Sequence, residues 1–136
     1  MIGIFDSGLG GLSVMREILK VLPHEDYVYY ADSAHCPYGG KSAEYVRDRA
    51  RSISEFLRSE GADIVVVACN TATAAAIATL RAESPDFPFV GMEPAVKPAA
   101  LASRSGVVGV LATAGTLKAT KYLDTKDRYP DGVKVV

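Results

Sequence analysis

A cysteine directly follows the most apolar run of the chain. Cys69 comes after residues 64–68, and the polar pair Asn70 and Thr71 comes next. The pattern places a thiol where a buried strand gives way to a helix, and the free N–H groups and dipole of a helix start favour negative charge. Because the thiolate is the reactive form of cysteine, we expect a lowered thiol pKa and proton-transfer or nucleophilic chemistry. A small buried cysteine without chemistry is the alternative, but the polar pair favours a functional site.

Polar side chains follow other predicted strands in the same way. Ligands of an open parallel sheet bind outside the carboxyl ends of its strands, so segments 6–11, 32–40, 69–71 and 112–116 should gather there. Hydroxyls, amides and carboxylates dominate these segments, which suits a small polar ligand better than a hydrophobic one. The candidates are Asp6, Ser7, Asp32, Ser33, Tyr38, Cys69, Asn70, Thr71, Thr113 and Thr116.

The glycine-rich segment 6–11 raises the question of a nucleotide site. The dinucleotide fingerprint needs its third glycine where this chain has Ser13, so that match fails. A tight turn, which needs the backbone freedom of glycine, explains the glycines of this segment equally well. Asp6 at the start of the turn has two open interpretations: a cap for the next helix, or a proton-handling group near Cys69.

Composition and charge exclude several classes of protein. The 136 residues carry a net charge of −1, so no basic field attracts nucleic acid or an anionic membrane. The longest apolar run is too short to span a bilayer, and the start of the chain does not read as a secretory signal, so we expect a cytoplasmic protein. His24 and His35 have no metal-like spacing with Cys36 or Cys69, and we therefore expect no metal site.

Short apolar runs alternate with longer helical patterns, which predicts parallel strands joined by helical crossovers. The fold class is therefore α/β, with an open, mainly parallel sheet and helices on both faces. We expect a first domain in residues 1–94, which contains Cys69, and a linker with an incomplete second α/β domain in residues 95–136. The predicted strands are 2–5, 27–30, 64–68, 89–92, 107–111 and 133–136; the predicted helices are 12–22, 43–60, 71–83, 95–103 (interrupted by Pro98) and 115–124.

The chain resembles the glutamate racemases of the cofactor-independent aspartate/glutamate racemase family. Five segments in the same order carry the resemblance, which runs from residue 2 to about residue 122. The Asp-Ser-Gly opening at Asp6 favours glutamate over aspartate as the substrate. The segments are 4–11, 30–33 with 37–39, 68–72, 93–97, and 109–113 with 115–116.

The resemblance implies a reaction and an architecture. Family members interconvert L- and D-glutamate without pyridoxal phosphate or another cofactor, and they supply D-glutamate for peptidoglycan. They have two α/β domains with the active site between them and one cysteine from each domain. One thiolate removes the Cα proton while the other thiol delivers a proton to the opposite face.

The resemblance also implies roles for individual residues. Cys69 is the first catalytic cysteine, and Asp6 contacts the substrate and tunes Cys69. The other positions bind substrate, through main-chain N–H groups at Tyr38 and Gly39 and through side chains elsewhere. They are Ser7, Tyr38, Gly39, Asn70, Thr71, Thr113 and Thr116.

The family's second catalytic cysteine, beside a Thr-His pair, has no counterpart in this sequence. Cys36 is either a replacement acid or, as we expect, a buried or spectator cysteine. Three functions stay open: a glutamate racemase present as a portion that is inactive alone, a non-catalytic binder of acidic amino acids, and an interaction module. An uncovered apolar face would promote association of the chain, for example as a homodimer.

Overall fold

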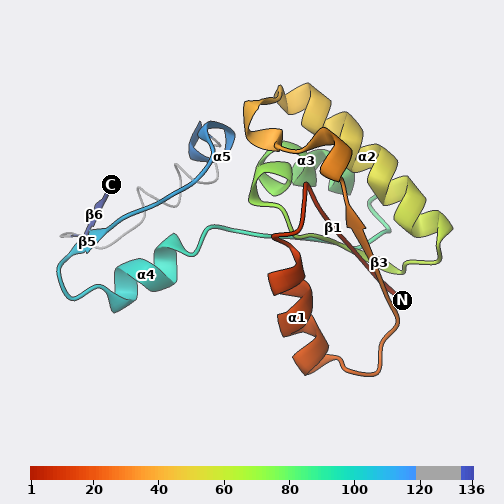
Figure 1. Ribbon diagram of the computed structural model, residues 1–136, viewed down its shortest axis with the longest axis horizontal. Helices are drawn as coiled ribbons and strands as arrows, with labels where there is room; N and C mark the ends of the chain where they lie inside the picture. The colour runs from red at the N-terminus through yellow and green to blue at the C-terminus, as the bar shows by residue number, and fades with distance from the viewer. Residues whose placement is uncertain (119–132) are drawn as a thin grey trace.

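The computed structural model describes residues 1–118 and 133–136, and its centre is a four-stranded parallel sheet (Figure 1). The strands lie in the order β2-β1-β3-β4, and every pairing between neighbours is parallel. This order confirms the predicted α/β class with a parallel sheet, and it places β1 beside β3. The bounds are β1 Ile2–Asp6, β2 Tyr27–Ala31, β3 Ile64–Val67 and β4 Phe89–Gly91.

Helices cover both faces of this sheet, as predicted. The helices α2 and α3 pack on one face and α1 packs on the other (Figure 1). Ser42 caps α2, because its Oγ accepts a hydrogen bond from the Tyr45 N–H at 3.1 Å. The bounds are α1 Leu12–Val21, α2 Ala43–Ser59 and α3 Asn70–Glu83, with two short 3-10 turns, η1 Ser33–His35 and η2 Tyr38–Gly40, in the loop after β2.

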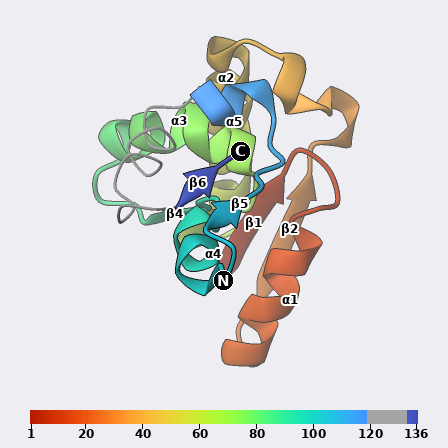
Figure 2. The same cartoon turned by 90° about the vertical axis from the view of Figure 1, so that its left-hand side faces the viewer.

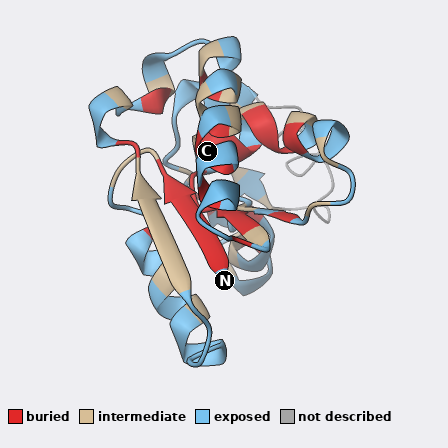
Figure 3. Cartoon of the chain, turned by 90° about the vertical axis from the view of Figure 1, so that its right-hand side faces the viewer, coloured by how far each residue is buried: buried red, intermediate tan, exposed pale blue. Residues whose placement is uncertain are grey.

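The hydrophobic core lies mainly between the sheet and the helices α2 and α3. Val65 and Val67 face this side, whereas Val66 and Ala68 face α1, so β3 is apolar on both faces as a central parallel strand should be. Figure 3 shows β1 as buried and the edge strand β2 as half-buried. α1 contributes no fully buried side chain, but the sheet residues that face it, among them Ile4 and Val66, are buried.

A smaller second part follows the sheet. Figure 2 looks onto this part, where the parallel pair β5–β6 lies beside α4. Pro98 does not interrupt α4, because it lies in the first turn, where main-chain N–H groups have no partner inside the helix. The elements are α4 Val96–Ala102, β5 Val107–Val108, α5 Ala114–Lys118 and β6 Lys134–Val135.

One strand and one helix of the second part differ from the predicted bounds. The predicted strand 107–111 is only two residues long, because β6 offers just two residues for pairing. The predicted helix 115–124 begins at Ala114, and residues 119–124 lie outside the described part of the chain.

Over the described residues, no helix combines the length and apolarity needed to cross a membrane. The proposed division at residue 94 stays a prediction.

The turn between β1 and α1 depends on the absence of a side chain at Gly11. A Cβ there would lie 2.8 Å from the Asp6 Cβ, 2.8 Å from the Tyr29 hydroxyl oxygen and 2.9 Å from the Ala68 Cβ. Gly11 has an ordinary φ of −64°, so the constraint is space and not backbone conformation.

We predict that Gly11→Ala lowers the free energy of unfolding by about 1–3 kcal/mol, because a methyl group must be forced into a filled space. Urea denaturation monitored by circular dichroism measures the change. Gly40→Ala is the matched control, since a Cβ at Gly40 meets nothing within 4 Å, and it should change stability by less than about 0.5 kcal/mol. Equal stability of the two variants would contradict the prediction.

Candidate active site

The pairing of β1 with β3 brings Ser7 to Cys69. Phe5 is the register partner of Val67, and the Ala68 N–H donates to the Phe5 carbonyl at 2.8 Å. Continuing the same register beyond both strands places Ser7 opposite Cys69. The Cys69 thiol donates to the Ser7 hydroxyl oxygen across 3.7 Å. The predicted meeting of these two loops at the carboxyl edge of the sheet is therefore present.

Cys69 sits at the start of α3, as the sequence indicates, but its pKa is not lowered. It is the N-cap residue, and its Sγ accepts the Ala72 N–H at 3.4 Å. Burial raises the pKa of Cys69, which is only 6% exposed; hydrogen bonds with Ala72 and Ser7 lower it, and the charge of Asp6 raises it. The net shift is upward, so the expectation of a lowered pKa is wrong: desolvation outweighs the helix start.

Asp6 is bound to the main chain of its own turn. Its Oδ2 accepts the N–H groups of Gly8 and Gly11, each at 3.1 Å. This arrangement favours the first interpretation of Asp6, a cap for the turn and the helix start. Tyr29 closes the same turn by donating to the Gly8 carbonyl at 3.1 Å, and burial raises the pKa of Tyr29 to about 12.

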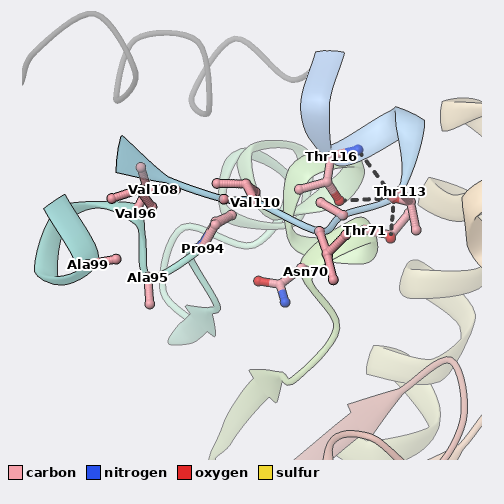
Figure 4. Close-up of a pocket in the computed structure, with 13 residues that line it drawn as sticks. Asn70, Thr71, Pro94, Ala95, Val96, Ala99, Val108, Val110, Thr113 and Thr116 are labelled. Atoms are coloured by element: carbon pink, nitrogen blue, oxygen red, sulfur yellow. Dashed lines mark hydrogen bonds between the residues drawn. The ribbon is translucent and has the colours of Figure 1, made fainter. Parts of the chain in front are cut away.

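Three of the predicted substrate-binding hydroxyls form one hydrogen-bonded cluster (Figure 4). Thr71 and Thr113 lie 3.0 Å apart between their Oγ1 atoms, and Thr113 and Thr116 lie 3.1 Å apart. The Thr116 N–H also donates to the Thr113 Oγ1 at 3.3 Å. The cluster joins the start of α3 to α5, so it links the sheet to the second part of the chain.

A cavity of about 520 Å³ opens beside this threonine cluster (Figure 4). Asn70 and the three threonines supply most of its polar lining, and residues 94–112 supply most of the rest. The volume suits a small ligand. Asp6, Ser7 and Cys69 do not line it. The structure therefore forms two adjoining groups, one around Cys69 and one around the cavity, which are joined because Asn70 directly follows Cys69.

The Tyr38–Gly39 turn lies against the threonine cluster. A Cβ at Gly39 would come within 2.7 Å of the Thr113 Cγ2, so the two segments are in close contact. The Tyr38 side chain is 2% exposed, and its hydroxyl donates to the Asp32 Oδ2 at 2.6 Å. Its ring belongs to the core, and carboxylate binding by the main chain of this turn stays a prediction.

The sequence does not predict the partners of Asp32. Arg49 of α2 donates to this carboxylate twice, at 3.0 Å and 2.8 Å. His35 is half-buried, and its Nδ1 lies 2.8 Å from the Asp32 Oδ1. Arg49 follows the buried Val46 by three residues, and this inward position on α2 was the signal that could have revealed it.

Cys36 is exposed and not buried. Its sulfur lies 3.7 Å from the position that a Cβ on Gly8 would occupy, so it lies next to the glycine-rich turn. Both cysteines are free thiols. Within residues 1–118 and 133–136, no three histidine, cysteine or acidic side chains gather in a way that would hold a metal ion.

Comparison with known proteins agrees with the resemblance. Residues 2–132 match the Asp/Glu/Hydantoin racemase family. The chain belongs to this family. It is 61% identical over 135 residues to a glutamate racemase of Ectopseudomonas mendocina and 58% identical over 134 residues to one of Pseudomonas aeruginosa. These matches cover 99% and 98% of the chain, and the chain spans about half the length of these relatives, 51% of each.

Solved structures of racemases share the fold. The Escherichia coli glutamate racemase, in complex with L-glutamate and the activator UDP-MurNAc-Ala, has a TM-score of 0.90 at 40% identity. The match covers 98% of this chain and 50% of that protein. The glutamate racemase of Aquifex pyrophilus has a TM-score of 0.85 at 40% identity, with coverage of 99% and 53%.

The environments of the two thiols predict different reactivity. We expect iodoacetamide to label the exposed Cys36 quickly and the buried Cys69 slowly at pH 7.5. Because the pKa of Cys69 is raised, less of it is thiolate at any given pH, and its labelling rate should keep rising above pH 9. Mass spectrometry of peptides labelled between pH 7 and 10.5 measures both rates. Labelling of Cys69 as fast as Cys36 at pH 7.5 would contradict the burial argument.

Proposed function

We propose that this chain supplies the first half of a glutamate racemase, which interconverts L- and D-glutamate without a cofactor. The observation that carries the proposal is the Cys69 thiol beside Ser7, adjoining a hydroxyl-lined cavity, in a chain 61% identical to a named glutamate racemase over 99% of its length. Solved relatives bound to L-glutamate in Escherichia coli and to D-glutamate in Francisella tularensis support both enantiomers as ligands.

In the proposed reaction, the Cys69 thiolate removes the Cα proton of glutamate from one face. The Ala72 N–H, which lies 3.4 Å from the sulfur, stabilises this thiolate. Negative charge then develops on the substrate's α-carboxylate, and neutral donors placed around it lower the barrier. We assign these donors to Asn70, to the threonine cluster and to the main chain of the Tyr38–Gly39 turn.

The raised pKa of Cys69 fits one direction of this reaction. A protonated thiol is the form that delivers a proton to the carbanion, and burial keeps Cys69 protonated at neutral pH. In the opposite direction Cys69 acts as the base and must first lose its proton. Hydrogen bonds that stabilise the thiolate therefore have a larger effect on the rate in that direction. The second thiol is proposed to come from the half of the family's length that this chain does not span.

The setting of the reaction follows from the same proposal. D-glutamate would serve peptidoglycan synthesis, and the reaction would take place in the cytoplasm. The thiols transfer the protons and the neutral donors stabilise the charge on the carboxylate, so the proposed mechanism uses neither pyridoxal phosphate nor a metal ion. Association of the chain as a homodimer stays a prediction.

A hybrid enzyme tests the proposed function. The present chain replaces the matching half of the Ectopseudomonas mendocina racemase, which it resembles at 61% identity. We expect the hybrid to invert glutamate with exchange of the Cα hydrogen in deuterated water, and the 136-residue chain alone to give no measurable inversion. Proton NMR and chiral chromatography on both enantiomers measure the outcome. A folded hybrid that does not invert glutamate would refute the function, and inversion by the chain alone would refute the need for a second half.

Substitution of each cysteine in the hybrid separates their roles. Cys69→Ser should reduce inversion roughly 100- to 10,000-fold, because the proton-transfer group is lost. Cys36→Ser is the matched control and should leave most of the activity, since the Cys36 thiol is exposed to solvent. Strong loss of inversion in a folded Cys36→Ser variant would instead assign the opposite-face proton to Cys36.

A further inference from the structure

A buried ionic cluster around Asp32 lies outside the proposed chemistry. The Asp32 side chain is only 2% exposed. Arg49 binds it through two parallel bonds, Nε to Oδ2 at 3.0 Å and Nη2 to Oδ1 at 2.8 Å. Tyr38 adds a third bond at 2.6 Å, and the His35 Nδ1 lies 2.8 Å from Oδ1. A forked pair of this kind fixes the orientation of both groups.

The charges of this cluster are set by its own contacts. Burial is the largest influence on Asp32 and opposes its ionisation, but the bonds from Arg49, Tyr38 and His35 together lower its pKa. Burial and the bond to Asp32 raise the pKa of Tyr38, so its hydroxyl stays a donor. The bond to Asp32 raises the pKa of Arg49, which stays a cation. Asp32, Tyr38 and Arg49 therefore keep these charges across the physiological pH range.

The cluster reaches the candidate site through the loop after β2. Tyr38 belongs to η2, and its carbonyl accepts the Lys41 N–H at 3.0 Å, which closes the turn. The next residue, Gly39, lies so close to Thr113 that a Cβ would come within 2.7 Å of the Thr113 Cγ2. A continuous line of contacts thus runs from Arg49 on α2 to the threonine cluster beside the cavity.

The side chains of this cluster take no part in the pairing of β2 with β1, although the Asp32 N–H donates to the Asp6 carbonyl at 2.9 Å. β2 is held by its own parallel ladder with β1, from Ile2 with Tyr27 to Asp6 with Ala31. The Asp32 cluster begins one residue after that ladder ends, and its side-chain partners are the loop of residues 33–40 and α2. Its position favours a role in holding the loop over a role in holding the sheet.

We propose that Arg49 is a positioning residue that acts through Asp32 and Tyr38. It holds the Tyr38–Gly39 turn against Thr113, so that the main-chain N–H groups of the turn and the threonine hydroxyls present one arrangement to an acidic amino acid. The inference rests on the proposed function for its substrate, but the ordering of the turn is measurable without activity.

Arg51 provides a matched control for Arg49. It lies two residues further along α2 and also makes a forked pair, with Glu83 at 2.8 Å and 2.7 Å. That pair is on the surface and joins α2 to α3, and Arg51 bonds in addition to Asp48 of α2. Arg49→Lys and Arg51→Lys therefore make the same chemical change in the same helix. Tyr38→Phe has a similar control in Tyr27→Phe, since the Tyr27 hydroxyl bonds to the Leu22 carbonyl away from the site.

The first experiment measures amide hydrogen exchange in the 136-residue chain. In Arg49→Lys and Tyr38→Phe, the Lys41 amide that closes the turn should exchange roughly tenfold faster, as expected for the loss of a hydrogen bond to a charged group. Amides of β3 should be unchanged, and both control variants should match the parent chain. Unchanged exchange at Lys41 would overturn the inference, whatever the activity of the hybrid.

The second experiment measures steady-state kinetics of the same variants in the hybrid racemase. Loss of positioning weakens ground-state and transition-state binding together, so Arg49→Lys should raise KM for glutamate roughly tenfold with little change in kcat. Arg51→Lys should change neither constant. If the parent hybrid racemises glutamate and Arg49→Lys behaves like Arg51→Lys, the positioning role is refuted and the proposed function stands.

Two further outcomes are also decisive. If no hybrid is active, the proposed function fails and the exchange data alone decide whether Arg49 orders the turn. If Arg49→Lys does not fold, Tyr38→Phe decides, because it removes a single oxygen and leaves the Arg49–Asp32 pair in place.

Discussion

The parallel pairing of β1 with β3 is the constraint on which the site depends. Its register pairs Ile2 with Ile64, and the same offset extended to the strand ends joins Ser7 to Cys69. Side chains alternate between the faces of a strand, so a slip by one residue would exchange the two faces. Val65 and Val67 would then leave the core under α2 and α3, and the thiol would lose its hydroxyl partner. Burial of apolar side chains on both faces of β3 therefore also fixes the position of the reactive sulfur.

The same packing that places the sulfur also limits its reactivity. The turn after β1 is closed by the carboxylate of Asp6, and Gly11 packs directly on Ala68. The Cys69 sulfur itself belongs to the core under α2 and α3, and burial raises its pKa despite the N–H groups of the helix start. A thiol in this state suits the role of proton donor, and its use as a base requires that hydrogen bonds recover part of the desolvation cost.

The elements of the sheet could be predicted from the sequence because local patterns define them. The strands and helices of the sheet agree with the structure to within one or two residues, because apolar periodicity and glycine or proline stops define them. The gathering of Ser7, Cys69 and Thr71 followed from the rule that parallel strands end at one edge. The predicted lowering of the Cys69 pKa was wrong, because this pKa depends on the balance between burial and hydrogen bonds in the folded protein. The partners of Asp32 could not be predicted because the main one, Arg49, lies 17 positions away on another element. The catalytic and binding role of each residue stays a prediction.

Among the residues that the structure describes, those lining the cavity beside the threonine cluster carry no charge. Each threonine hydroxyl both donates and accepts, so a ligand that enters exchanges existing hydrogen bonds and gains only about 0.5–1.5 kcal/mol from each new one. In the proposed function, affinity of these residues for a carboxylate comes from several neutral donors that already point in fixed directions. A flexible lysine would bind the anion more strongly in the ground state, but it would also hold the substrate without directing its Cα towards a sulfur. Neutral donors on rigid segments bind an anion less strongly and orient it better, and for this reason the fixed geometry of the Tyr38–Gly39 turn matters as much as the thiol in the proposed reaction.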